Sequence, residues 1–129
     1  MNKKDLKVLI KGLIREGIER TVRLYRGLEG EYDSNYGQGD APSGYSTWTD
    51  TEALAREYAG SDGNVYYIDI PIKFQGDNYI DEDPTSDYYG DRTLFYFNDK
   101  KAGLHGVSGK EVLVYDDHEE FENLVIKKL

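Results

Sequence analysis

Four side chains able to bind or stabilise charged groups stand at three well-separated places in the sequence. Arg26 ends a short apolar run and leads directly into Gly27. Ser46 and Thr47 come just before a helix signal, and Glu111 lies on a later alternating run, SGKEVLVY. A guanidinium pairs with phosphate or carboxylate oxygens, and a fixed carboxylate stabilises positive charge or accepts a proton. Each residue alone is weak evidence, because exposed arginines and glutamates are common on strands, so the hypothesis rests on their combination and order.

The first two places are joined by a glycine-rich segment. Leu24-Tyr25-Arg26 predicts a short strand. The loop after it spans roughly fifteen residues without periodicity, which is typical of functional or mobile loops. Neither GKS nor GKT follows its glycines, so it is not a phosphate-binding P-loop. A disordered surface excursion is the alternative interpretation.

Two helices are predicted in the first half of the chain. One covers residues 3–23, where apolar residues recur at helical spacing, and it is expected to pack on a sheet. The alternative for this basic segment is a membrane-surface helix. The other helix follows the Ser-Thr pair: Thr49 and Glu52 have capping-box spacing, and Gly60 can end it. Its face of small and apolar residues consists of Leu54, Ala55, Tyr58 and Ala59.

The second half of the chain reads as strands. On one apolar run, the two-residue period puts two valines on one face and Glu111 on the other. If the valines enter the core, Glu111 points to a cleft or to solvent. The pattern of early helices and late strands predicts an α+β fold with mostly antiparallel sheets. The predicted strands are 64–72, 93–97, 109–116 and 121–128, with an acidic loop at 75–92 and a turn at 98–103.

The composition limits the classes of partner. The 129 residues predict a single domain, 1–129, and the net charge of −9 argues against binding nucleic-acid backbones or anionic membranes. Cysteine is absent, which excludes disulfides and thiolate metal sites. His105 and His118 do not form a zinc-ligand pattern, so no metal site is predicted. With a charged N-terminus and no membrane-length apolar run, a cytoplasmic protein is expected.

The order of these motifs resembles the R-S-E class of ADP-ribosyltransferases. The resemblance runs through LYRG, YST with the helix ALAREYA, VYYIDIP and GKEVLVY, and it covers roughly residues 24–116. It implies a split β-sandwich with an N-terminal helix and a second helix after the Ser-Thr motif. It also implies that NAD is bound as a substrate in the cleft between two sheets.

The resemblance gives each residue an expected role. Glu111 would be the catalytic residue, accepting a hydrogen bond from the ribose next to nicotinamide and stabilising the oxocarbenium-like charge formed there. Ser46 would hydrogen-bond within the cleft and help hold Glu111, while Thr47 would support the same strand. Arg26 would contact the NAD phosphates or the adjoining ribose. Tyr25 and Gly27, its neighbours in LYRG, complete the expected NAD-binding set.

Two positions depart from that family's pattern. Trp48 stands where the family's Ser-Thr-Ser motif usually has its second serine, and we expect Trp48 in the core rather than stacked on nicotinamide. Gly109 stands two residues before Glu111, where enzymes that modify arginine, asparagine or cysteine often carry Gln or Glu. The acceptor type is therefore open among protein, nucleic acid, small molecule and water.

The sequence leaves three functional hypotheses. The first is NAD-dependent transfer of ADP-ribose to a macromolecule, expected to be a host or partner protein, as in compact effectors, toxins and bacteriophage proteins. The second is a non-catalytic acidic binding or inhibitor protein on the same fold, which masks a basic partner. The third is a relative of RNA 2′-phosphotransferases, a group that usually has more basic side chains for phosphate contact than this chain shows.

Overall fold

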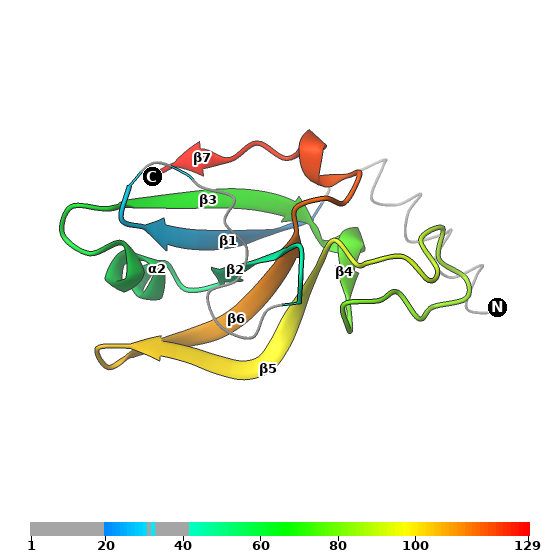
Figure 1. The fold of residues 1–129 in the computed structure, drawn as a ribbon, viewed down its shortest axis with the longest axis horizontal. Coiled ribbons are helices and arrows are strands. Elements are labelled where there is room, and N and C mark those ends of the chain that lie inside the picture. Colours follow the sequence, from blue (N-terminus) through cyan, green and yellow to red (C-terminus); the bar gives the residue numbers. More distant parts are fainter. Residues whose placement is uncertain (1–19, 31, 33–41) are drawn as a thin grey trace.

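The computed structural model describes residues 20–30, 32 and 42–129 (Figure 1). Within them, seven strands form one open sheet in the order β4-β5-β6-β2-β1-β3-β7. All neighbouring strands are antiparallel except β4 and β5, which are parallel. The strands are β1 Thr21–Leu28, β2 Tyr45–Thr49, β3 Asn64–Pro71, β4 Gln75–Gly76, β5 Phe95–Leu104, β6 Val107–Tyr115 and β7 Lys127–Lys128. The helical elements are α2 Glu52–Ala59 and the 3-10 helices η1 Ile72–Phe74 and η2 Phe121–Asn123.

The sheet is weakly joined at its centre. Strand β1 pairs with β3 along its full length, and β2 pairs with β6 over all five of its residues. Between β1 and β2, however, the register holds one pair, Tyr25 with Thr49. Figure 1 shows β1 and β3 side by side with their arrows pointing in opposite directions, while β5 and β6 run obliquely below them. The expected α+β fold with mostly antiparallel strands is confirmed, but the described strands form one open sheet with a split, not two separate sheets.

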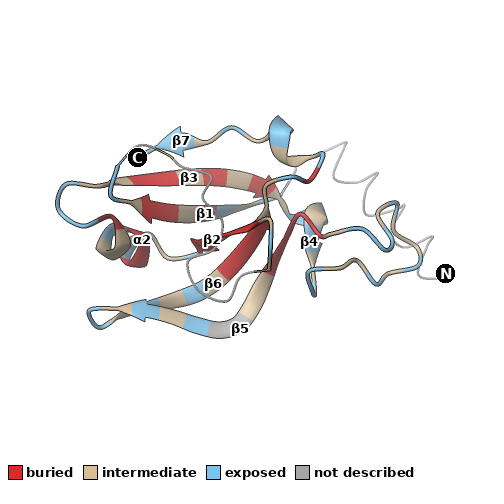
Figure 2. Ribbon diagram, viewed as in Figure 1, coloured by how far each residue is buried: buried red, intermediate tan, exposed pale blue. Residues whose placement is uncertain are grey.

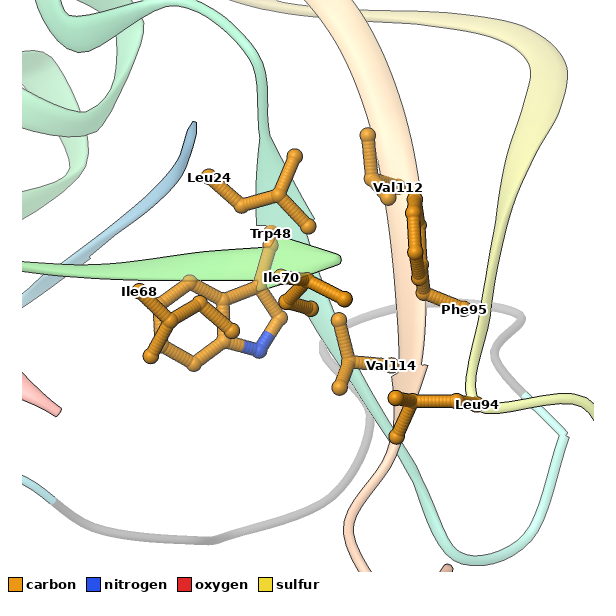
Figure 3. Close-up of a cluster of buried hydrophobic side chains, with 8 residues drawn as sticks. All are labelled: Leu24, Trp48, Ile68, Ile70, Leu94, Phe95, Val112 and Val114. Atoms are coloured by element: carbon orange, nitrogen blue, oxygen red, sulfur yellow. The ribbon is translucent and has the colours of Figure 1, made fainter. Parts of the chain in front are cut away.

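The core lies on the face of the sheet that carries Val112 and Val114. Both valines are fully buried, as their alternation on β6 predicts. Figure 3 shows these two side chains converging with those from β1, β2, β3 and β5. Figure 2 shows buried residues along β1 and β3 and near the C-terminal end of β6, with burial declining toward the tip of the β5–β6 hairpin. The cluster consists of Leu24, Trp48, Ile68, Ile70, Leu94, Phe95, Val112 and Val114.

Helix α2 covers the opposite face of β1. Its Ala55 and Ala59 pack against Val65, with Tyr25 beside them. The approach is so close that a Cβ on Gly27 would lie 1.8 Å from the backbone oxygen of Ala55. Only glycine therefore permits α2 to sit on β1 at this point, which fixes the helix directly beside the split in the sheet.

The sequence correctly predicts how α2 ends but not how it begins. Gly60 has a φ of +71° and its N–H donates to the Arg56 carbonyl, so the predicted glycine stop is confirmed. The predicted capping box is wrong, because Thr49 belongs to β2 and the N-cap is Thr51 without a side-chain cap. The Thr49 hydroxyl instead accepts a hydrogen bond from the Thr51 N–H at 3.2 Å.

Three other predicted boundaries are corrected by strand pairing. The predicted helix 3–23 lies outside the described residues up to position 19, but from Thr21 onward the chain is strand, because each residue there pairs with β3. The predicted turn at 98–103 is part of β5, which continues past a register shift, and the hairpin turns at His105 and Gly106. Most of the predicted strand 121–128 is instead η2 and extended chain, with only β7 pairing to β3.

Candidate functional site at the split between β1 and β2

A cavity of about 220 Å³ opens where β1 and β2 diverge. The predicted site residues come to it from distant parts of the sequence, with Arg26 on β1, Thr47 on β2 and Glu111 on β6. Of the residues predicted for the site, only Ser46 does not border it. The lining residues are Tyr25, Arg26, Gly27, Thr47, Trp48, Thr49, Tyr58, Ala102 and Glu111.

Arg26 brings a buried positive charge to this cavity. The residue is only 6% exposed, and it is held in β1 opposite Tyr66 of β3. A guanidinium is costly to bury without counter-charges, because removing an ion from water is unfavourable. Asp116, just after β6, is one such counter-charge, because Arg26 favours the ionised form of its carboxyl. The cavity wall therefore has a fixed cation suited to phosphate or carboxylate oxygens.

Glu111 is positioned by the two strands that flank β6. It pairs with Thr49 on one side and with Asn98 on the other. The Asn98 side-chain nitrogen donates to Glu111 Oε1 at 3.0 Å, which fixes one carboxylate oxygen, and the described residues form no hydrogen bond with the other. Asn98 was not identifiable from the sequence, because it lies where a turn was predicted. Only the hairpin register places it beside Glu111.

Ser46 occupies a different place from the one the family resemblance implies. It pairs with Val114, on the face of β2 that enters the core, and its side chain is fully buried. Its hydroxyl donates to Asp116 Oδ1 at 2.7 Å and accepts a hydrogen bond from Trp48 Nε1 at 2.8 Å. The expected contact between Ser46 and Glu111 is not formed. Of the Ser-Thr pair, Thr47 is the residue on the Glu111 side, because it pairs with Leu113, two residues along the same face; Thr49, which pairs with Glu111 itself, lies on that face too.

Asp116 is a second residue that sequence reasoning missed. Its carboxyl is partly buried, and burial raises its pKa, opposed by the Ser46 hydrogen bond and by the charge of Arg26. Among the described residues, its Oδ2 atom is buried and accepts no hydrogen bond. The Asp116 carboxyl therefore interacts with two groups: it accepts a hydrogen bond from the Ser46 hydroxyl, which holds Trp48, and it is stabilised in its ionised form by Arg26. No sequence signal singled it out, because it sits among several acidic residues after β6.

The two departures from the family pattern have structural explanations. Trp48 is 2% exposed and belongs to the core cluster, as expected, while also closing one side of the cavity. At Gly109, a Cβ would lie 2.6 Å from Thr51 Oγ1 and 2.8 Å from Thr49 Oγ1. The chain from β2 to α2 thus occupies the space that a side chain at 109 would need.

The remaining titratable candidates lie elsewhere. His105, at the tip of the β5–β6 hairpin, is exposed, and its Nδ1 lies 3.1 Å from Glu57 Oε2 on α2. His118 is buried near η1 and does not border the cavity at the split. In the described part of the chain, no group of three or more acidic or histidine side chains is arranged to hold a metal ion. The same residues include no helix long and apolar enough to cross a membrane.

Comparisons of this chain with protein-family models, with curated proteins and with solved structures found no match. The interpretation of the site therefore rests on its own residues and geometry.

Proposed function

We propose that the protein transfers ADP-ribose from NAD to a macromolecular acceptor, with release of nicotinamide. The observation that carries the proposal is that Arg26 and Glu111, from opposite ends of the described chain, border one cavity at the split between β1 and β2. A buried guanidinium and a hydrogen-bonded carboxylate in one concave site are the two groups this chemistry needs. A protein acceptor is the expected class, and a host factor is one example.

The substrate is proposed to bind with its reactive end near Glu111. A cavity of about 220 Å³ is smaller than an ordinary ligand pocket of about 300–1,000 Å³. It therefore accommodates part of the dinucleotide, and we assign it to the nicotinamide and its ribose. Arg26 offers charge-assisted hydrogen bonds to the adjoining phosphates. Of the Ser-Thr pair, Thr47 and not Ser46 offers a hydroxyl on this side of β2, next to that of Thr49.

The reaction breaks the bond between the nicotinamide nitrogen and ribose C1′. Nicotinamide leaves with the bonding electron pair, and positive charge develops on the ribose, as in glycoside hydrolysis. The Glu111 carboxylate stabilises that charge from a fixed position, because Asn98 restrains one of its oxygens. A nucleophile on the acceptor then forms the new bond to C1′ and loses a proton, for which the free oxygen of Glu111 is the nearest proposed base.

The test is release of nicotinamide and transfer of label from labelled NAD in a cell lysate. We expect Glu111→Gln to reduce both by about 100-fold or more, since removing one group that stabilises charge in a transition state typically costs 10²–10³ in rate. Glu122→Gln, an exposed change of the same type on η2, is the matched control and should retain full activity.

The outcomes separate catalysis from simple binding. Activity that survives in Glu111→Gln would remove Glu111 from its role. If the wild-type protein neither releases nicotinamide nor binds NAD, as measured by calorimetry, the proposal fails and the binding-protein hypothesis is favoured. Binding of NAD without turnover would retain the site but contradict the reaction.

A further inference from the structure

A second cavity, of about 330 Å³, lies beside η1 and β4, at a different end of the molecule from α2 (Figure 1). Three rings stand around one side of it. The Tyr88 ring lies 5.2 Å from that of His118, and the Phe74 ring lies 6.4 Å from Tyr88 and 6.5 Å from His118, between ring centroids. All three residues border the cavity. The three rings, inclined to one another by 52°, 56° and 72°, give the cavity aromatic surfaces of the kind that organic cations contact.

His118 presents a hydrogen-bond donor that the described residues do not use. The residue is 8% exposed, and its Nδ1 accepts a hydrogen bond from the Glu120 N–H at 3.0 Å. A neutral imidazole that accepts through Nδ1 carries its proton on Nε2. Burial lowers the pKa of His118, which favours this neutral form. Within the described part of the chain, Nε2–H has no acceptor, although it belongs to a side chain at the cavity wall.

The lining of this cavity is also acidic. Asp77, Asp81, Glu82 and Asp83 all border it, and the one cationic residue among the lining residues is Lys73, whose amine lies 5.1 Å from the Phe74 ring centroid. The Asp83 N–H donates to Asp81 Oδ1 at 2.9 Å, so this carboxylate is held in place by its own loop.

Hydrogen bonds hold the loop that carries these carboxylates against the sheet. The Tyr45 hydroxyl, fully buried in β2, donates to the Tyr79 carbonyl at 2.7 Å, and the Thr93 N–H donates to the same carbonyl at 2.9 Å. The Asp81 N–H and carbonyl bond to Asp91 and Gly90, each at 2.8 Å. A site held in this way loses little conformational entropy on binding.

We propose that this cavity binds an arginine side chain of a peptide segment in a protein partner. The guanidinium stacks on the Tyr88 ring, to which the Phe74 ring is inclined by 72°, and it pairs with the carboxylates, for which its planar fork is suited. The backbone carbonyl of the bound segment accepts the hydrogen bond from His118 Nε2. This requirement for both a cation and an acceptor selects a peptide over a free metal ion. The proposal is independent of the NAD chemistry at the split.

The first experiment follows the two histidines by NMR while an acetylated and amidated Gly-Gly-Arg-Gly-Gly peptide is added. The chain has only two histidines, so the imidazole spectrum contains one reporter inside the cavity, His118, and one outside, His105. We expect saturable shifts of the His118 nitrogen signals and none of His105. The same peptide with lysine in place of arginine should bind several-fold more weakly, because an ammonium lacks the planar fork.

The second experiment changes the acidic rim with Asp77→Asn combined with Glu82→Gln. Both side chains are exposed, so folding should be retained. Peptide affinity is expected to fall about tenfold, as for two surface charge pairs of up to about 1 kcal/mol each. Glu29→Gln with Asp62→Asn changes the net charge equally outside the cavity and should leave affinity unchanged. Equal losses in both double variants, or no His118 shift at 10 mM (roughly the weak limit of specific binding), would overturn the proposal.

Discussion

The two cavities differ in how the chain builds them. The cavity at the split takes Arg26 from β1, Thr47 from β2 and Glu111 from β6, so it exists only when three strands are in register. The acidic cavity is lined by residues 73–94 with a single distant contribution, His118. The first is bordered by one buried cation and one carboxylate, whereas the second is bordered by several carboxylates and three rings. A site built from residues on three strands therefore depends on strand register. A site built mainly from one segment depends on the hydrogen bonds that hold that segment against the sheet.

The strongest way to sharpen this comparison is to assay both sites in the same variants. Glu111→Gln is expected to lower NAD turnover by about 100-fold or more while leaving arginine-peptide affinity within about twofold of wild type. Asp77→Asn with Glu82→Gln should lower arginine-peptide affinity about tenfold and leave NAD turnover within about twofold of wild type. Turnover and peptide titrations on the same preparations provide the measurement. If each variant lowers both NAD turnover and peptide affinity, the two cavities are coupled and are not independent sites.

The next effect concerns the helix beside the split. Gly27→Ala puts a methyl group 1.8 Å from the backbone oxygen of Ala55, and backbone atoms of α2 cannot turn aside as a flexible side chain can. We expect a loss of about 3 kcal/mol in the free energy of unfolding, at the upper end for overpacking. Gly30→Ala is the control and should change stability little, because the described residues other than its chain neighbours place no atom within 4 Å of the new Cβ. Urea unfolding of both variants measures this, and equal stabilities would contradict the close approach of α2 to β1.

A smaller effect is expected from the buried carboxyl behind the split. Burial raises the pKa of Asp116 in the folded protein, whereas the unfolded chain has a pKa of about 3.9. Between these two pKa values, the folded protein retains a proton on Asp116 that the unfolded chain has lost. The free energy of unfolding contributed by this group therefore falls as the pH rises from about 3.9 through the raised pKa. Asp116→Asn should remove that fall, so its stability relative to wild type should increase over this pH range.

The control for this prediction is Asp62→Asn, an exposed aspartate that is not among the charges acting on Asp116, and this variant should follow the wild-type pH dependence. Denaturant unfolding at a series of pH values provides the measurement. Parallel curves for wild type and Asp116→Asn would mean that the ionised Asp116 carboxyl is fully compensated by Arg26 and Ser46.

Local patterns were sufficient for much of the fold. The alternation of valines in SGKEVLVY predicts which face of β6 enters the core, because successive side chains on a strand point to opposite faces. Gly60 predicts the end of α2, because glycine readily adopts the positive φ found there. The helical periodicity at residues 21–23 was misleading, because pairing with β3 outweighs a weak local preference. The turn predicted at 98–103 failed for the same reason, since β5 continues its pairing with β6.

The sequence by itself determined the fold class, the core face of β6 and the order in which Arg26, the Ser-Thr pair and Glu111 follow one another. Only the tertiary structure decided that Thr47, and not Ser46, shares a cavity with Glu111, and that Asn98 and Asp116 accompany the site. The reason is the two-residue period of a strand: adjacent side chains face opposite sides, so strand register decides which of two neighbouring hydroxyls reaches the cavity. That register is fixed by pairing between segments far apart in the chain, which no local pattern encodes.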